Sequence, residues 1–281
     1  VIGFDKVATL DEAEKTGEET MKKMGCKSLA EMRALPADEL LAKSAGTYMP
    51  KMYNIDGYFF TEQPAETYAA GRQAHVPLLV GWNSTEVPIA SVLGNRPRTV
   101  AAVKEAITPR FGKDTDKVME AYGLVTDDDV EGEPGAQLAG DMFVGFGTWK
   151  WADMHAKTGG QPVYRYLYCH PRPVMRDTDL VPGLAGGVQK KTEENKDALT
   201  VTGAVHSADI EYAMGTLPTN RVYDWQPEDF TVSAIFQNYY LNFIKTGNPN
   251  GLGLPEWTPV NGKDVSPVMR IDVDSYELSL I

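Results

Sequence analysis

The sequence predicts an α/β fold in which a mostly parallel sheet is flanked by helices. One observation is the continuous apolar run HVPLLVG at 75–81, which lacks polar alternation and is typical of a strand buried on both faces of such a sheet. A second is the stretch at 162–170, where side chains alternate between the two faces of a strand. A third is a set of helical segments with apolar stripes, of which 137–155 and 227–246 are the clearest.

Composition sets the broad class of protein. The 281 residues are 42% hydrophobic, which supports a substantial core in one large domain or two small ones. The formal net charge of −12, without clustered Lys and Arg, argues against nucleic acid and an anionic membrane surface as partners. No run of eighteen apolar residues occurs, so no transmembrane helix is expected. The two cysteines, Cys26 and Cys169, are compatible with either one disulfide or two buried thiols.

Peripheral helices are expected at the start of the chain. Thr9 and Glu12 have the spacing of a capping box, and Gly25 is placed to end the helix that they begin. Capping-box spacing recurs at Ser28, and Pro36 opens a further short helical pattern. Helices are therefore predicted over 9–24, from Ser28, from Pro36 and over 64–71.

The apolar strand at 75–81 runs into the sequence Trp-Asn-Ser-Thr-Glu, which ends at Glu86. A carboxylate just past the carboxyl end of a buried strand lies where open α/β sheets place their binding and catalytic sites. The alternative is that Glu86 is an ordinary acid at the start of a helix capped by Asn83 or Ser84. Both interpretations remain open on position alone.

The middle of the chain is predicted to be helical and largely structural. Surface helices are expected over 98–112 and 115–123, followed by a solvated acidic loop over 127–135. The apolar stripe of the helix at 137–155 is typical of core packing, and His155 near its end complements the helix dipole.

After the strand at 162–170, whose His170 we interpret as structural, little apolar material is available until residue 202. Loops of that length are usually functional or disordered, so 171–202 is predicted to be a mobile rim of a site. The helix at 227–246 should bury Val232, Ile235, Phe236, Tyr239, Phe243 and Ile244 and end at Gly247. A small closing strand is expected at 268–273.

The segment 203–215, GAVHSADIEYAMG, places one histidine in a turn of small residues. Such a turn can present the His206 imidazole at a surface. Glu86 followed by His206 is the order in which α/β-hydrolases carry the last two members of a Ser-Glu-His triad. Spacing alone does not establish a triad. A metal site formed by His206, Asp209 and Glu211 is an alternative that no further histidine cluster supports.

Several stretches together resemble the type-B carboxylesterases and cholinesterase-like proteins. VPLLVGWNSTE at 76–86 resembles the segment that delivers the triad glutamate of that family, and 203–215 resembles the one that delivers its histidine. FIKTGNPN at 243–250 follows in the family's order and spacing. The resemblance extends from about residue 8 to the end of the chain.

The resemblance implies that residues 1–281 form the carboxyl-terminal half of an α/β-hydrolase fold that hydrolyses small-molecule carboxylic esters. It implies that His206 is the general base, that Glu86 is its orienting acid, and that Asp209 is a supporting acid close to the site. It implies neither a cofactor nor a metal. A secreted or periplasmic location follows from the family, with the cytoplasm as the alternative.

The chain departs from the family in lacking a nucleophile. No Gly-x-Ser-x-Gly occurs, and the superficially similar Lys43-Ser44-Ala45-Gly46 has Ala42 where the motif requires glycine. The resemblance therefore implies a partner, the amino-terminal half of the same enzyme, that carries the serine. The competing interpretation is a cholinesterase-like interaction domain that has lost catalysis and binds proteins.

Overall fold

The computed structural model describes residues 6–44, 53–183, 187–193, 195, 203–260, 262 and 266–280. The chain divides into two compact units. One comprises Phe4–Gln73, and the other comprises Ala74–Ile281 together with Val1–Gly3.

The smaller unit is helical, as predicted for the peripheral segments. The capping box at the first helix is present, because the Thr9 hydroxyl accepts from the Glu12 amide at 3.3 Å and the Glu12 carboxylate accepts from the Thr9 amide at 2.8 Å. Ser44 ends a helix, where its hydroxyl donates to the Leu41 carbonyl, and residues 45 and 46 lie outside the described part of the chain. The helices of this unit are α1 (Leu10–Lys23), α2 (Leu29–Ala34), α3 (Ala37–Ser44) and α4 (Pro64–Ala69).

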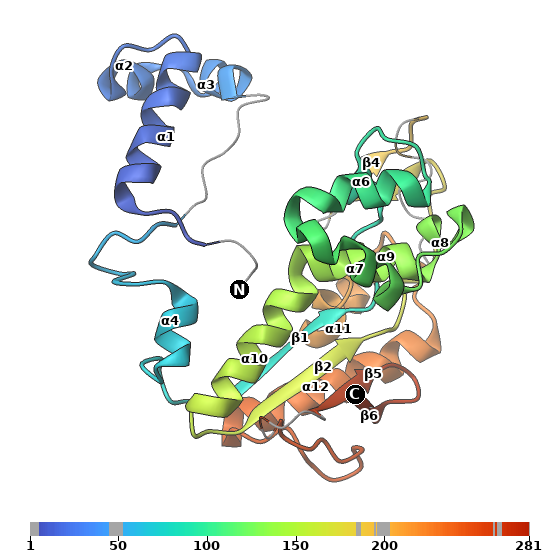
Figure 1. Ribbon diagram of the computed structural model, residues 1–281. Helices are drawn as coiled ribbons and strands as arrows, with labels where there is room; N and C mark the ends of the chain where they lie inside the picture. The colour runs from blue at the N-terminus through green and yellow to red at the C-terminus, as the bar shows by residue number, and fades with distance from the viewer. Residues whose placement is uncertain are drawn as a thin grey trace. The chain divides into compact units, whose positions relative to one another are not determined.

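The larger unit is built on a sheet with strand order β1-β2-β5-β6 (Figure 1). β1 (Leu78–Asn83) is parallel to β2 (Val163–Tyr168), which is parallel to β5 (Ser266–Ile271). β5 is antiparallel to β6 (Tyr276–Leu280). The predicted mostly parallel sheet is therefore confirmed, and the expected closing strand is a hairpin.

The two faces of β2 are covered by different helices. Tyr164, Tyr166 and Tyr168 pack with residues of α12 (Pro227–Thr246) in the main core. On the opposite face, Val163 packs with residues of α10 (Phe146–Thr158). The sheet thus lies between α10 and α12, as Figure 1 shows.

β1 differs from its prediction as a strand buried on both faces. Leu78 to Trp82 are only half-buried, because no strand of the described residues pairs with the outer edge of β1. Gly81 is required by packing, since a Cβ at this position would lie 2.4 Å from the Tyr166 ring. The strand also begins later than predicted, after Pro77, which has no amide to donate to a neighbouring strand.

Helices after β1 form a second apolar cluster that includes Leu93, Val103, Ile107 and Val130. The prediction of a solvated loop over 127–135 was wrong, because Thr126 and Asp129 form a capping box that starts a helix and Val130 is fully buried in the cluster. These elements are α5 (Ala90–Leu93), α6 (Val100–Phe111), η1 (Gly112–Asp114), α7 (Thr115–Tyr122), α8 (Asp127–Glu131) and α9 (Glu133–Gly140).

The helix expected at 137–155 is interrupted. A π-helical segment, η2 (Asp141–Gly145), lies between α9 and α10. Wide turns of this kind are frequent at functional sites. His155 of α10 is buried, and its Nε2 lies 2.8 Å from the Val76 carbonyl oxygen.

The segment predicted as a long loop contains a small hairpin, in which β3 (Leu180–Pro182) pairs with β4 (Val188–Lys190) in antiparallel fashion. Residues 184–186, 194 and 196–202 lie outside the described residues. The mobile rim therefore stays a prediction.

Two helices complete the larger unit. α11 (Ile210–Met214) leads through η3 (Leu217–Thr219) to α12, which has the predicted bounds and ends at Gly247 with a positive φ of 74°. Ile244 is 74% exposed, contrary to the predicted stripe, whereas Val232 and Phe236 are fully buried. Both cysteines are free thiols; Cys26 is buried and Cys169 is partly exposed.

Candidate active site

Glu86 lies three residues beyond β1, at the edge of the sheet where β1 and β2 end. The chain turns back after Asn83, so the Asn83 amide donates to Glu86 Oε1 at 2.7 Å. The residue is 4% exposed. α5 begins only at Ala90 and has no side-chain cap, so the alternative of Glu86 as an acid at the start of a helix capped by Asn83 or Ser84 is wrong.

The His206 turn is attached to the same strand end by three hydrogen bonds. The Ala204 amide donates to Ser84 Oγ at 3.1 Å, and the Thr85 amide donates to the Ala204 carbonyl at 2.9 Å. The His206 amide donates to the Glu86 carbonyl at 3.0 Å. Because none of these three bonds involves the imidazole, the position of the turn is fixed independently of the ring.

The structure brings the two predicted site residues into direct contact. His206 Nδ1 lies 2.6 Å from Glu86 Oε2, a short distance typical of a hydrogen bond to an ionised partner. With Nδ1 donating to the carboxylate, Nε2 is the basic nitrogen of the neutral ring. The His206 side chain is 31% exposed, whereas the Glu86 side chain is 5% exposed.

Burial dominates the electrostatics of the carboxylate. It raises the pKa of Glu86 above its ordinary value, and the bonds from the Asn83 amide and His206 oppose that rise. Asp209 contributes a further, smaller increase through like-charge repulsion. The imidazole therefore faces a carboxylate whose negative charge is little screened by water.

Asp209 lies beside this pair and is held by two side chains. Asn83 Nδ2 donates to Asp209 Oδ1 at 3.2 Å and to the Val205 carbonyl at 2.7 Å. The Tyr166 hydroxyl donates to Asp209 Oδ2 at 3.3 Å. Asp209 thus supports the turn that carries His206 without itself bonding to the imidazole.

Sequence reasoning missed three residues that shape this region. Asn83 and Tyr166 hold Asp209, as just described, and Phe143 packs its ring edge-on to the His206 ring with centroids 5.1 Å apart. Phe143 belongs to η2 and is 47% exposed. The available signal was weak: Asn83 ends the apolar strand, and an amide there is common at turns.

The other acid of the motif, Glu211, and its neighbour Tyr212 bond to groups away from His206. Glu211 pairs with Arg172 at 2.6 Å and accepts from Asn220 at 3.0 Å. The Tyr212 hydroxyl donates to Asp229 at 2.5 Å. Among the residues that the structure describes, no group of three His, Cys, Asp or Glu side chains is arranged to hold a metal ion.

His170, interpreted from the sequence as structural, bridges two carboxylates. Its Nδ1 lies 2.9 Å from Asp272 Oδ1, and its Nε2 lies 3.0 Å from Asp229 Oδ1. It ties the end of β2 to β5 and to the start of α12, and it has no bond to the Glu86–His206 pair.

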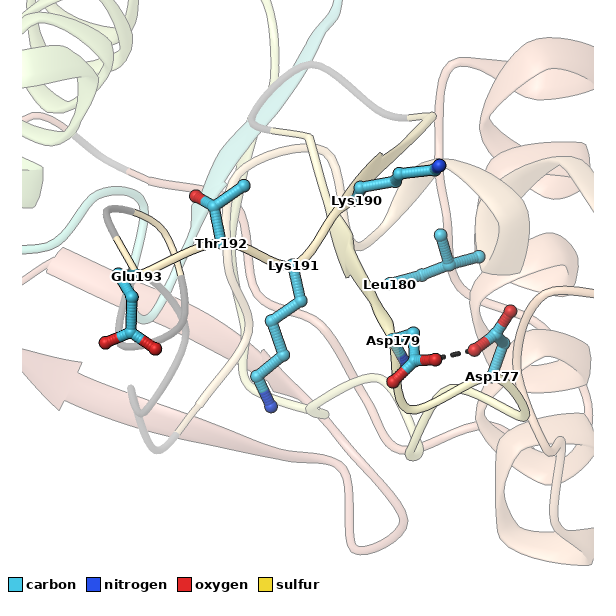
Figure 2. A pocket seen from close by; sticks show the side chains of 7 residues that line it. All are labelled: Asp177, Asp179, Leu180, Lys190, Lys191, Thr192 and Glu193. Carbon is cyan, nitrogen blue, oxygen red and sulfur yellow. Dashed lines mark hydrogen bonds between the residues drawn. The ribbon is translucent and has the colours of Figure 1, made fainter.

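A pocket of about 580 Å³ lies at the β3–β4 hairpin (Figure 2). Its polar lining carries both signs of charge, and neither Glu86 nor His206 contributes to it. Figure 2 shows Lys190 at the end of β4 with Lys191 directly after it, and Asp177 and Asp179 just before β3. This pocket is therefore distinct from the Glu86–His206 pair.

Comparison with known proteins gives a consistent result. The family model described as "Carboxylesterase family" matches residues 3–279. Carboxylesterase 4A of Bos taurus is 26% identical over 223 residues, which are 74% of this chain and 36% of the relative. Acylcarnitine hydrolase of Mus musculus is 25% identical over 240 residues, 80% of this chain and 37% of the relative.

Solved structures show the same fold. A thermophilic PNB esterase superposes with a TM-score of 0.69 at 16% identity, and a carboxylesterase of Geobacillus stearothermophilus with 0.67 at 19%. Each comparison covers 97% of this chain and 53% of the other. The chain thus has an α/β-hydrolase fold and spans about half the length of these structures. No helix in the described part of the chain is long and apolar enough to cross a membrane.

Proposed function

Since the chain belongs to the carboxylesterase family, we propose that it supplies Glu86 and His206 to a Ser-Glu-His triad whose serine lies on the amino-terminal half of the same enzyme. The assembled protein would hydrolyse small-molecule carboxylic esters. The observation that carries this proposal is the 2.6 Å hydrogen bond between Glu86 Oε2 and His206 Nδ1 at the carboxyl end of parallel strands.

The proposed chemistry uses the basic Nε2 of His206. Nε2 accepts the proton of the serine hydroxyl as the serine oxygen bonds to the ester carbonyl carbon, and it then gives that proton to the departing alcohol. A water molecule repeats the sequence on the acyl-enzyme: its proton passes to Nε2 and from there to the serine oxygen when the acid leaves. The buried Glu86 carboxylate holds the Nδ1–H tautomer and stabilises the imidazolium.

The outer edge of β1 supports the proposed partner. Within the described residues β1 pairs only with β2, and its residues Leu78 to Trp82 are half-buried. A parallel strand from the amino-terminal half would satisfy the free backbone groups of this edge and cover its side chains. Such a strand would end at the same sheet edge as Glu86, which is where a nucleophile carried by a following turn must lie.

The second candidate is a protein-interaction domain without catalysis. The paired Glu86 and His206 favour the enzyme, because a binding domain has no need for an imidazole whose Nδ1 is fixed by a buried carboxylate. An exported location remains a prediction from the family.

The experiment is reconstitution. We expect this chain, co-expressed with the amino-terminal half carrying the Gly-x-Ser-x-Gly serine, to hydrolyse p-nitrophenyl acetate, and expect the chain alone to lack enzyme-like activity. His206→Ala should abolish the assembled activity, with the exposed His75→Ala as the matched control. An enzyme-like rate for the chain alone, lost on His206→Ala, would refute the split site. An assembled protein without esterase activity would favour the interaction domain.

A further inference from the structure

Ser207, the residue directly after His206, has an unusual backbone conformation. Its φ is +63°, and it is the one non-glycine residue with a positive φ in the described part of the chain. A side chain in this left-handed region is strained and persists only where surrounding contacts hold it. The strain lies in the turn that sets the direction of the His206 ring.

Arg172, in the segment that follows β2, forms a hydrogen bond to this turn. Its Nη2 donates to the Ser207 carbonyl oxygen at 2.6 Å and to Glu211 Oε2 at 2.6 Å. The side chain is only 6% exposed, and its guanidinium lies 5.3 Å from the centre of the Tyr223 ring. An arginine fixed in this way acts as a rigid donor and not as a mobile surface charge.

Glu211 keeps Arg172 in place. Its second oxygen, Oε1, accepts from Asn220 Nδ2 at 3.0 Å, so both carboxylate oxygens are engaged. Glu211 also lies on α11, the helix that the turn leads into. The contacts therefore connect α11 to Arg172 and Arg172 to the Ser207 carbonyl.

We propose that Arg172 is a positioning residue for His206, which keeps the strained Ser207 turn in the conformation that directs the imidazole to Glu86. The inference rests on the proposed function of His206. Arg172 does not touch the imidazole; it acts through the Ser207 carbonyl. Without this bond the turn relaxes from the left-handed conformation, and the ring moves away from the geometry in which Nε2 can receive the serine proton.

The test separates positioning from a structural ion pair. Arg172→Gln alone leaves the partly buried Glu211 without its cation, so the main variant is Arg172→Gln with Glu211→Gln, which removes both charges together. We expect kcat of the assembled enzyme to fall about 10-fold to 100-fold, since a displacement of about 1 Å can cost 10²-fold. KM should change little, because Arg172 Nη2 bonds to the Ser207 carbonyl and to Glu211 and is thereby engaged within this unit. Glu211→Gln alone still offers an acceptor oxygen to Arg172 and so keeps the Arg172–Ser207 bond, and kcat should fall much less in this variant.

Rescue gives the sharper outcome. Glycine adopts a positive φ without strain, so adding Ser207→Gly to the double variant should recover most of the lost kcat, measured against Ser207→Gly alone as the baseline. If Arg172 and Glu211 formed only a structural ion pair, Glu211→Gln and the double variant would lose kcat equally, and Ser207→Gly would restore none of it. That result would overturn the proposal.

A spectroscopic measurement makes the test independent of activity. The sequence has four histidines, so ¹⁵N-histidine labelling gives a small set of ring signals, with His206 assigned by its loss in His206→Ala. We expect the hydrogen-bonded Nδ1–H signal of His206 to disappear in the double variant and to return with Ser207→Gly. An unchanged signal in the double variant would refute the role of Arg172, whereas an inactive assembled enzyme in which this signal responds would refute only the proposed function.

Discussion

Replacing Glu86 by glutamine tests how the site fixes its histidine tautomer. The Asn83 amide donates to Oε1 at 2.7 Å, so a glutamine must place its carbonyl oxygen there. Its NH₂ group then faces His206 Nδ1, where the carboxylate oxygen lies at 2.6 Å in the native chain. The amide donates to Nδ1 and forces the ring proton onto Nε2. In that tautomer His206 cannot accept a proton from serine.

The expected loss is large. Triads with the wrong tautomer lose about 10⁴-fold in kcat, which corresponds to about 5.4 kcal/mol in activation free energy. The assay is kcat for p-nitrophenyl acetate with the assembled enzyme. Glu133→Gln, on the exposed start of α9, is the matched control for the same chemical change. Activity of Glu86→Gln within 10-fold of the native enzyme would refute the tautomer argument.

The folding stability of Glu86→Gln should not fall together with its activity. Because the pKa of Glu86 is raised in the folded state, the stability that its protonated form contributes is present below the ordinary value of 4.5 and is lost as pH rises through the folded value. Glutamine stays neutral and avoids this loss. We therefore expect Glu86→Gln to be at least as stable as the native protein at pH 7, so that lost activity cannot be attributed to unfolding.

Two further predictions concern pH and association. Asp141 accepts a hydrogen bond from the Tyr122 hydroxyl at 2.7 Å, and burial raises the pKa of Asp141. The folding stability that its protonated form contributes is therefore present below pH 3.8, its ordinary pKa, and is lost as pH rises through its pKa in the folded state. Asp141→Asn should gain stability over the native protein between pH 4 and 7; a gain that shrinks with pH would contradict this. The open edge of β1 predicts that the chain alone self-associates, and a monodisperse monomer by light scattering would contradict that.

Local signals made much of the fold predictable. Three local patterns each gave an element of the right type: the capping box at Thr9, the apolar positions of α12 and the apolar run of β1. The prediction of a loop over 127–135 was wrong because it rested on the acidic charge alone. It did not consider the capping box, or Val130, which is buried in an apolar cluster with residues distant in the sequence.

The contact between Glu86 and His206 was predictable only through the resemblance. Nothing in the local sequence shows that Glu86 and His206, 120 residues apart, form a hydrogen bond, because their contact depends on how the turn at 203–206 pairs with the end of β1. Arg172 and Phe143 were missed for the same reason. Phe143 also depends on the π-helical segment, whose wider turn a regular helical period does not predict.

Whether His206 activates a serine is measured most directly by the rate at which a fluorophosphonate modifies the assembled enzyme, with the modified peptide identified by mass spectrometry. This reagent bonds to a serine that a histidine has activated. We expect modification of the serine on the amino-terminal half and a rate at least about 100-fold slower with His206→Ala, since triad residues act as a unit. Equal rates for the native enzyme and the His206→Ala variant, or modification of a serine within this chain, would contradict it.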